Sequence, residues 1–301
     1  MRKLLSFSLC FALLLALPAC AAGKEQPENP YRCTSYLSES FATDGSILST
    51  VRIEYGYSEE DTDLYTTCTH YTDGVETYKE TVEKKDAYGN IIKSIHSDNG
   101  KTTTYEFTYT LDEQHRPLRI EGFSDGEPYF VTEHSYDKDG NKTFSRYCAL
   151  ENGQITEVTE EECVYDQDGN VIRRSVPVHD SYYQMTYSDG LLVYQASTDE
   201  KGNVKTYKEF LYDDQGREIQ CSEYNGTGNL KETTKHTYDE TGLRKETQTY
   251  SAVGKPSSSK VIFTFDIYGN VLSRELHTQN KLGEWSVSNR TTYTYEPIPT
   301  P

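Results

Sequence analysis

The chain has 301 residues, a formal net charge of −18 and a hydrophobic fraction of only 35%. Such low apolar content argues against a large enzyme core with helices packed on both faces of a sheet. The negative charge argues against nucleic acid as a partner and against docking on an anionic membrane surface, since both need clusters of Lys and Arg.

Residues 1–19 have the pattern of an export signal. Arg2 and Lys3 form a charged start, and residues 4–17 form an apolar run shorter than the roughly 20 residues of a membrane-spanning helix. The run ends in Leu17-Pro18-Ala19-Cys20, which resembles the lipobox of bacterial lipoproteins. The resemblance implies cleavage after Ala19 and a lipid on Cys20, and an ordinary secretory signal is the alternative.

Residues 20–30 are polar, contain Pro and Gly and have no apolar period. We expect a flexible tether behind the lipidated Cys20, with an extended reach of about 30 Å. No second apolar stretch follows. The sequence therefore predicts an extracytoplasmic chain held at a bacterial cell membrane by the lipid on Cys20.

Residues 31–295 are dominated by a repeat of about 26 residues. A low content of aliphatic residues together with a high net charge normally indicates disorder. A disordered chain, however, has no reason to keep regular spacing. All 26 Tyr lie beyond the signal, where they can pack as amphipathic rings. The repeat therefore indicates a folded domain, followed by a Pro-rich tail at residues 296–301.

Two alternating sets of turns mark the repeat. In the first set, Asp can accept from the backbone two residues on and Gly three residues later supplies a positive φ, which predicts hairpin turns closed by a bulge. These turns begin at Asp86, Asp137, Asp166, Asp213, Asp239 and Asp266, with variants at Leu111–His115 and Ser188–Gly190. The second set falls halfway between, at Gly100, Gly126, Gly153, Gly202, Gly226, Gly254 and Gly283.

The segments between the turns are rich in Thr, Tyr, Val, Ile and Phe. Residues 101–109 alternate aromatic and polar side chains, as a half-buried strand does. The sequence therefore predicts an all-β fold, a long twisted antiparallel β-meander of about 20 strands built from hairpins of about 26 residues. At about 20° of twist per strand pair such a sheet must curl and partly protect one Tyr-rich face. We expect its first and last strands to be open edges that permit self-association.

The motif Tyr-Asp-x-x-Gly recurs in phase at Tyr136, Tyr165, Tyr212 and Tyr238, with Phe265 in the same place. It resembles the YD repeats of the RHS family, over roughly residues 87–295. The resemblance implies a curling β-sheet, which in that family is often a shell around a secreted toxin. The chain departs from the family in its longer period and in lacking the core-closing segment and a toxin domain. A stand-alone lipoprotein with YD-like repeats is therefore the closer match.

Motifs that carry chemistry are scarce. The seven His have no metal-ligand spacing, and the acidic runs 59–61 and 160–162 are expected to be solvated surface in or beside turns. The turns at Asp137 and Asp166 resemble the start of a calcium loop but lack its downstream Glu, and turn geometry explains them fully. We therefore expect no catalytic, cofactor-binding or metal site and no cofactor.

Cysteine pairing is left open by the sequence. With Cys20 lipidated, the remaining exported cysteines are Cys33, Cys68, Cys148, Cys163 and Cys221, so at least one is unpaired. If Asn152-Gly153 forms the turn, Cys148 should face about residue 157, about 20 Å from Cys163 at strand rise. We expect no bridge between these two.

These observations favour a non-enzymatic, membrane-anchored scaffold or adhesive module that binds a cell-surface protein or glycan. One alternative is a cell-envelope hydrolase whose site the sequence does not reveal. Another is a component linked to RHS-type toxin delivery or immunity.

Overall fold

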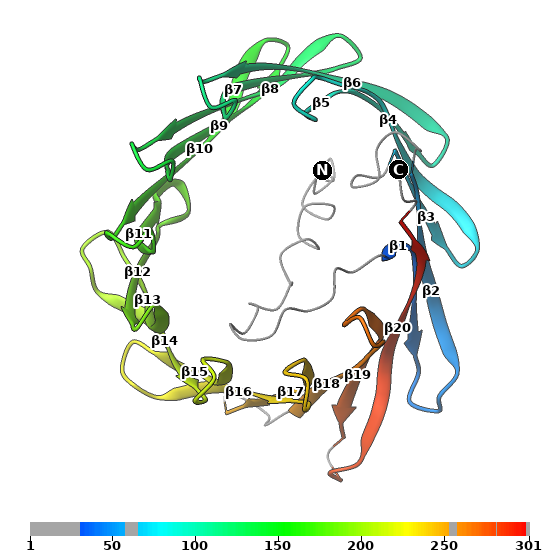
Figure 1. Ribbon diagram of the computed structural model, residues 1–301, viewed down its shortest axis with the longest axis vertical. Coiled ribbons are helices and arrows are strands. Elements are labelled where there is room, and N and C mark those ends of the chain that lie inside the picture. The colour runs from blue at the N-terminus through cyan, green and yellow to red at the C-terminus, as the bar shows by residue number, and fades with distance from the viewer. Residues whose placement is uncertain (1–30, 58–65, 253–257, 281, 299–301) are drawn as a thin grey trace.

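The computed structural model describes residues 31–57, 66–252, 258–280 and 282–298. These residues form a single sheet of 20 antiparallel strands, as the repeat predicts. Each strand pairs with the next one in the chain, and β1 also pairs with β20, so that the sheet closes into a ring (Figure 1). The signal, Cys20 and the tether lie outside the described residues.

The strands have the following bounds: β1 Tyr31–Phe41, β2 Ile47–Gly56, β3 Thr67–Thr72, β4 Val75–Lys85, β5 Ile91–Asp98, β6 Lys101–Leu111, β7 Pro117–Ser124, β8 Glu127–Tyr136, β9 Lys142–Glu151, β10 Gln154–Tyr165, β11 Val171–Val176, β12 Ser181–Ser188, β13 Leu191–Thr198, β14 Val204–Tyr212, β15 Glu218–Asn225, β16 Leu230–Tyr238, β17 Arg244–Ser251, β18 Ser258–Phe265, β19 Val271–Gln279 and β20 Trp285–Pro297. A short 3-10 turn, η1 (Pro177–His179), connects β11 to β12.

The expectation of open edges is wrong. Strands β1 and β20 pair from Tyr31 opposite Pro297 to Ser40 opposite Asn289, and Arg32 forms an ion pair with Glu296 at 2.8 Å. The accumulated twist brings the two ends of the meander together, and pairing satisfies their backbone groups. Glu296 and Pro297, which the sequence assigns to the tail, belong to this last strand.

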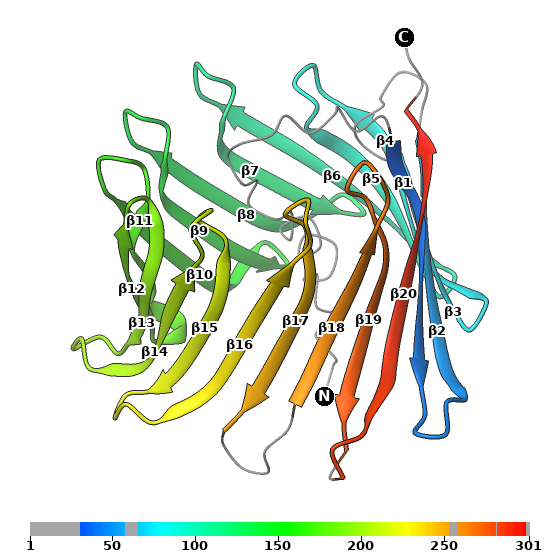
Figure 2. The same ribbon diagram turned by 60° about the horizontal axis from the view of Figure 1, so that its bottom comes forward.

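The ring has two rims, and successive turns alternate between them. The tyrosine rim, at the top of Figure 2, carries the turns that follow even-numbered strands, together with the start of β1 and the end of β20. The far rim carries the turns that follow odd-numbered strands. Both ends of the described domain therefore lie at the tyrosine rim.

Seven of the described turns at the tyrosine rim have the predicted chemistry, whereas the variant at Ser188–Gly190 is a two-residue turn in which Asp189 and Gly190 both adopt positive φ. In the turn 137–141, the Asp137 amide donates to the Asn141 carbonyl at 3.0 Å, and Gly140 adopts φ 93°. His115 occupies the glycine position of the variant turn 112–116 and adopts φ 63°, which histidine tolerates better than most residues. In the far-rim turn 225–229, Gly228 rather than Gly226 takes the positive φ.

The tyrosines that precede these turns face into the ring. Consider a strand that runs upward, with the side chain of one residue pointing toward the viewer. For an L-residue, the N–H and C=O groups of that residue then point to the right. The Asp137 amide bonds toward β9. Consecutive residues of a strand point their N–H and C=O groups in opposite directions, so those of Tyr136 point toward β7. Seen from the Tyr136 side with the tyrosine rim upward, strand numbers therefore increase from right to left. Figure 2 shows β15 to β20 from outside with the same rim upward, and there the strand numbers increase from left to right. The Tyr136 side is therefore the inner side of the ring.

Side-chain exposure agrees with this assignment. On β14 the inward positions Lys208, Phe210 and Tyr212 are half-buried, whereas the outward Glu209 and Leu211 are exposed. Side chains on the concave face of a curved sheet converge and shield one another. The Tyr-rich face is thus partly protected, as the sequence predicts.

Few side chains are fully buried. Among the described residues the buried apolar ones are Ile53, Cys68, Cys148, Val176 and Ala196. Stability must therefore come mainly from the strand ladders and from cross-strand rows of side chains, as in other repeat proteins.

Candidate functional site: the inner face and the tyrosine rim

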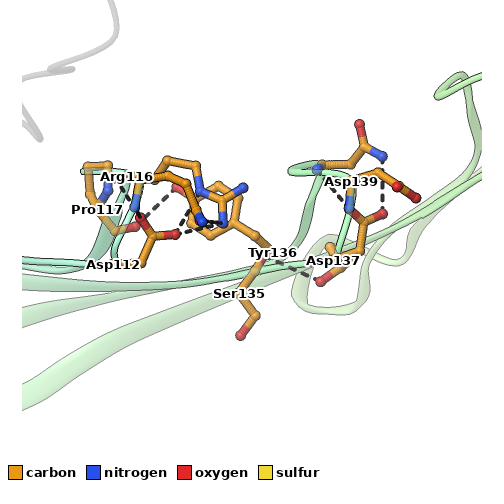
Figure 3. Close-up of polar contacts among 10 residues, drawn as sticks. Asp112, Arg116, Pro117, Ser135, Tyr136, Asp137 and Asp139 are labelled. Carbon is orange, nitrogen blue, oxygen red and sulfur yellow. Dashed lines mark hydrogen bonds and ion pairs between the residues drawn. The ribbon is translucent and has the colours of Figure 1, made fainter.

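A series of hydroxyl groups ties neighbouring hairpins together at the tyrosine rim. The Tyr136 hydroxyl donates to the carbonyl of Pro117, the first residue of β7, at 3.1 Å (Figure 3). The Arg116 guanidinium lies 4.4 Å above the Tyr136 ring and pairs with Asp112 at 2.7 Å. Each turn is therefore held against the strand of the preceding hairpin.

The same bond recurs around the rim. Its members are Tyr109 to Ile91, Tyr165 to Lys142, Tyr187 to Val171, Tyr212 to Leu192, Tyr238 to Glu218 and Tyr295 to Val271, at 2.7 to 3.1 Å. We call these six bonds and that of Tyr136, seven in all, the tyrosine staples. Phe265 occupies the equivalent place on β18 and has no hydroxyl.

The two calcium-like turns use their leading carboxylates internally. Asp137 Oδ1 accepts from the amides of Asp139 and Asn141 at 2.9 Å, and Oδ2 accepts from the Asn141 side chain at 3.1 Å (Figure 3). The Asp166 turn repeats this pattern. A concavity of about 660 Å³ lies between the two turns. Among the described residues no group of three or more His, Cys, Asp or Glu is arranged to hold a metal ion.

Acidification is expected to weaken these turns. Hydrogen bonds from the side chain of the fifth turn residue lower the pKa of Asp86, Asp137, Asp166 and Asp199 below the usual range. Their stabilisation is therefore complete above the unfolded Asp pKa of about 3.9 and is lost as the pH falls through the lower folded value. We expect the thermal unfolding midpoint to fall below about pH 4.

The pH series has a matched variant. In the double variant Asp137→Asn, Asp166→Asn two of these carboxylates are gone, so its midpoint should change less between pH 5 and pH 3 than that of the natural chain. Equal pH dependence of the two proteins would contradict the proposed contribution of the turns.

A polar cluster lies on the inner face of β3, β4 and β5. His96 Nδ1 lies 3.0 Å from the Tyr78 hydroxyl, while its Nε2 lies 3.0 Å from Ser94 Oγ and 3.4 Å from Glu80 Oε1. Both ring nitrogens therefore have partners within the sheet. Ser94 is only 1% exposed, so an external substrate cannot reach its hydroxyl.

Cys68 and His70 extend this cluster along β3. Cys68 Sγ lies 3.3 Å from His70 Nε2, and the His70 ring packs edge-on against Tyr78. Burial lowers the pKa of His70, so its imidazole is neutral near neutral pH. A neutral, half-buried imidazole in this position serves packing and hydrogen bonding.

A second histidine cluster lies on β15, β16 and β17. His236 Nε2 lies 3.2 Å from Glu218 Oε1, and Nδ1 lies 2.8 Å from Thr247 Oγ1. The hydrogen bond with His236 lowers the pKa of the Glu218 carboxyl. The order of carboxylate, imidazole and hydroxyl matches that of a nucleophilic triad, but the His236 side chain is only 7% exposed.

Aromatic rings continue the first cluster around the inner face. Successive contacts join His96 to Tyr105, Tyr105 to Tyr129, Tyr129 to Phe130 and Phe130 to Tyr147, with ring centroids 4.5 to 6.1 Å apart. On β7 the row crosses Gly122, which pairs with Phe107 and Phe130. A Cβ atom at Gly122 would lie 2.7 Å from Cδ1 and 2.8 Å from Cζ of Phe130. Glycine is therefore required beneath this ring.

The opposite, outer face is charged at mid-strand. A ladder of alternating ion pairs crosses β7 to β10, with Arg119 to Glu133 at 2.5 Å, Glu133 to Arg146 at 3.9 Å and Arg146 to Glu160 at 3.4 Å. The side chains are 39 to 48% exposed. Each pair contributes little stability by itself, but the row marks this face as one that water covers.

The sequence predicts that the acidic run 160–162 lies in or beside a turn. It lies instead within β10. Alternation along the strand points Glu160 and Glu162 outward and Glu161 inward. Glu161 forms a two-pronged ion pair with Arg174, each oxygen at 3.0 Å from a guanidinium nitrogen. The other acidic run, residues 59–61, lies outside the described ranges.

All five cysteines of the described segments are free thiols. Cys148 lies opposite Val158 rather than residue 157, because the ladder shifts by one residue between Ile155 and Glu157. Cys163 lies opposite Arg174 and points inward, whereas Cys148 points outward. The two thiols occupy different faces of the sheet, so they cannot form a bridge.

Cys20, the predicted lipidation residue, lies outside the described residues. Within the described segments, no helix is long and apolar enough to cross a membrane.

Sequence spacing did contain a signal for the polar clusters. Ser94 and His96, Cys68 and His70, and Tyr78 and Glu80 are each two residues apart, which places each pair on one face of a strand. Which strands bring these pairs together depends on register, and the sequence alone did not reveal it.

Comparisons with known proteins assign no family. No protein-family model matches the chain, and no curated protein sequence matches it. A crystal structure of TcdB2-TccC3-TEV has a TM-score of 0.45 and 13% identity over 85% of this chain, which spans 14% of that chain's length. A porin-like protein from Bacteroides uniformis gives 0.36 and 14% identity over 90% of this chain and 99% of the other. The Photorhabdus luminescens Tc holotoxin pore gives 0.28 and 10% identity, over 83% of this chain and 20% of the other. Scores this low assign no function.

Proposed function

We propose that this protein is a non-catalytic, lipid-anchored, extracytoplasmic β-repeat module that acts as a surface scaffold and binds a cell-surface protein or glycan. The observation that carries the proposal is the set of contacts that the histidine side chains make. In both inner-face clusters the imidazole nitrogens are bonded to neighbouring strands, and Ser94 and His236 are shielded from solvent. These groups hold the ring together, which is the task of a scaffold.

The ring geometry supports an anchor on Cys20. Tyr31 opens β1 at the tyrosine rim, so a tether from Cys20 would reach the domain at that rim. The tyrosine rim would then face the membrane and the far rim would face away from it. The charged ladder on the outer face supports a setting in water, since charged side chains are costly on a lipid-facing surface.

The anchor has a direct test. In cells that express the full-length chain, the protein should fractionate with membranes and incorporate labelled fatty acid. The variant Cys20→Ser should lose the label and shift almost entirely to the soluble fraction, because a lipid chain is the only anchor proposed. The variant Cys33→Ser controls for loss of a thiol and should remain with membranes. Membrane retention of unlabelled Cys20→Ser protein that has lost residues 1–19 would contradict the anchor.

The binding role is tested with the full-length chain in phosphatidylcholine nanodiscs. The loaded discs are presented to intact bacterial cells and to isolated envelope polysaccharide, with empty discs as the blank. Saturable retention by one of the two would support a binding module and identify the ligand as protein or glycan. Absence of retention by both would contradict the binding role, while turnover of the polysaccharide would favour a hydrolase.

A further inference from the structure

Exposed aliphatic side chains flank the turns of both rims, and those of the far rim form one set. They lie in or directly beside seven of its turns: Ile47, Leu48, Val75, Ile155, Val178, Val204, Leu230 and Leu282, with exposed fractions from 39 to 84%. Positions next to a hairpin turn are usually polar, and scattered single apolar residues would need no explanation. The tyrosine rim carries a comparable set, namely Leu118, Val164, Ile172, Leu211, Ile219, Ile267 and Leu272, so the far rim is distinguished only by where its most exposed members lie.

Three of the most exposed far-rim residues lie in or beside neighbouring turns at the closure of the ring. Leu282 is 84% exposed in the turn between β19 and β20, Leu48 is 67% exposed after the turn between β1 and β2, and Val75 is 65% exposed after the turn between β3 and β4. The turns after β19 and β1 protrude side by side at the lower rim in Figure 2. The Asp73 carboxylate and amide bond to the backbone of Thr50 at 2.8 and 2.9 Å, which joins the third turn to β2.

Carboxylates belong to the same turns as these aliphatic residues. Asp44, Asp73, Glu76 and Glu284 lie in or next to the same three turns. The described residues of these turns include no Lys or Arg, and the sequence adds Lys281 outside the described ranges. We call Ile47, Leu48, Val75 and Leu282, with these four acids, the rim patch. It is both apolar and acidic.

We propose that the rim patch is a docking surface for a cationic amphipathic segment of a partner protein, with aliphatic side chains set among Lys or Arg. Apolar contact with the exposed tips supplies the affinity, and the acidic frame selects the cationic partner. A second copy would present the same acids, and an anionic lipid surface would also be repelled. This inference rests on the proposed binding role and gives that role a location and a partner chemistry.

The orientation of the ring is consistent with this use. The far rim is opposite to the rim at which the chain enters from Cys20, so the rim patch would project away from the membrane. A partner in the extracytoplasmic space could therefore reach it without competition from the lipid surface.

The test uses the full-length chain in phosphatidylcholine nanodiscs and a synthetic amphipathic peptide of leucine and lysine. We expect saturable binding above the signal of empty discs, and weaker binding at high salt because the frame is exposed. The double variant Leu48→Ser, Leu282→Ser should bind at least about tenfold more weakly, since these side chains make the largest apolar tips. The double variant Ile155→Ser, Val178→Ser, on the same rim but away from the patch, should bind within about twofold of the natural chain.

Three results would overturn the proposal. One is equal affinity of the two double variants, and another is equal binding of a leucine and glutamate peptide. The third is concentration-dependent self-association that only the Leu48→Ser, Leu282→Ser variant loses, which would assign the patch to a second copy. If cells or polysaccharide are retained equally by this variant and the natural chain, the binding role stands and the rim patch is not its site.

Discussion

Replacing Gly122 with valine is expected to lower the free energy of unfolding by about 3 kcal/mol, as overpacking of a well-filled site does. The new Cβ would meet Cδ1 and Cζ of Phe130 at 2.7 and 2.8 Å, and its methyl groups would come closer still. Phe130 cannot simply move away, because it packs against Phe107, Tyr129 and Tyr147. Urea unfolding followed by circular dichroism measures the change.

The assignment to the Phe130 ring has its own control. In a Phe130→Ala background the space above residue 122 is open, so Gly122→Val should cost less than about 1 kcal/mol there. The difference between the two backgrounds is the coupling free energy of the pair. An equal cost in both backgrounds would place the strain in the backbone rather than against the ring.

The need for glycine at this position could not be predicted from the sequence. Gly122 lies within a strand, whereas the glycines of the turns are recognisable from the Asp or Asn that precedes them. Its role depends on register, since β7 must place it opposite both Phe107 and Phe130. A bulge between Gly122 and Phe123 also turns Tyr129 toward the same row. Propensity alone would describe Gly122 as a weak point of the strand.

The turns, in contrast, were predictable because their chemistry is local. Asp and Gly three residues apart specify the hairpin whatever the rest of the chain does, and counting hairpins gives the number of strands. Even the variant turn at His115 keeps the geometry. The early turns at Asp44 and Asp73 lack the full repeat motif and were not singled out, although Gly45 and Gly74 adopt positive φ there.

Closure of the ring is a nonlocal property. The partners Tyr36 and Tyr293, whose rings lie 5.8 Å apart, are separated by almost the whole domain. Twist predicts that a sheet of this width must curl, but whether its edges meet depends on strand tilt and on the bulges beside the hairpins. The repeat motif contains neither quantity. The polar clusters around His96 and His236 were missed for the same reason.

Removing the ring of Tyr238 is the second change with a large expected effect. The variant Tyr238→Ala should lose about 3 kcal/mol of unfolding free energy, because it removes a half-buried aromatic ring. Two contacts disappear with the ring: the hydroxyl bond to the Glu218 carbonyl at 2.7 Å and the Arg217 guanidinium 4.6 Å from the ring centroid. Urea unfolding monitored by circular dichroism again gives the value.

The conservative variant separates the staple from the ring. Tyr238→Phe keeps the ring and loses only the hydroxyl, so it should cost about 1 kcal/mol, the usual net worth of one hydrogen bond. Tyr88→Phe is the matched control, since Tyr88 is 56% exposed and its replacement should change stability by less than about 0.5 kcal/mol. Equal effects of the two substitutions would show that the hydroxyl bonds at the rim contribute nothing.

Phe265 provides the reverse experiment within the same molecule. In each staple the accepting carbonyl belongs to the first or second residue of the strand that precedes the tyrosine's own strand. A hydroxyl at position 265 should therefore reach the carbonyl of Arg244, which opens β17. Phe265→Tyr is therefore expected to raise the free energy of unfolding by about 1 kcal/mol. A loss of stability would mean that the β17 to β18 contact departs from the repeat geometry. A gain would show that the rim is held by one bond repeated from hairpin to hairpin, and that its natural interruption at Phe265 is a point where the ring is weaker.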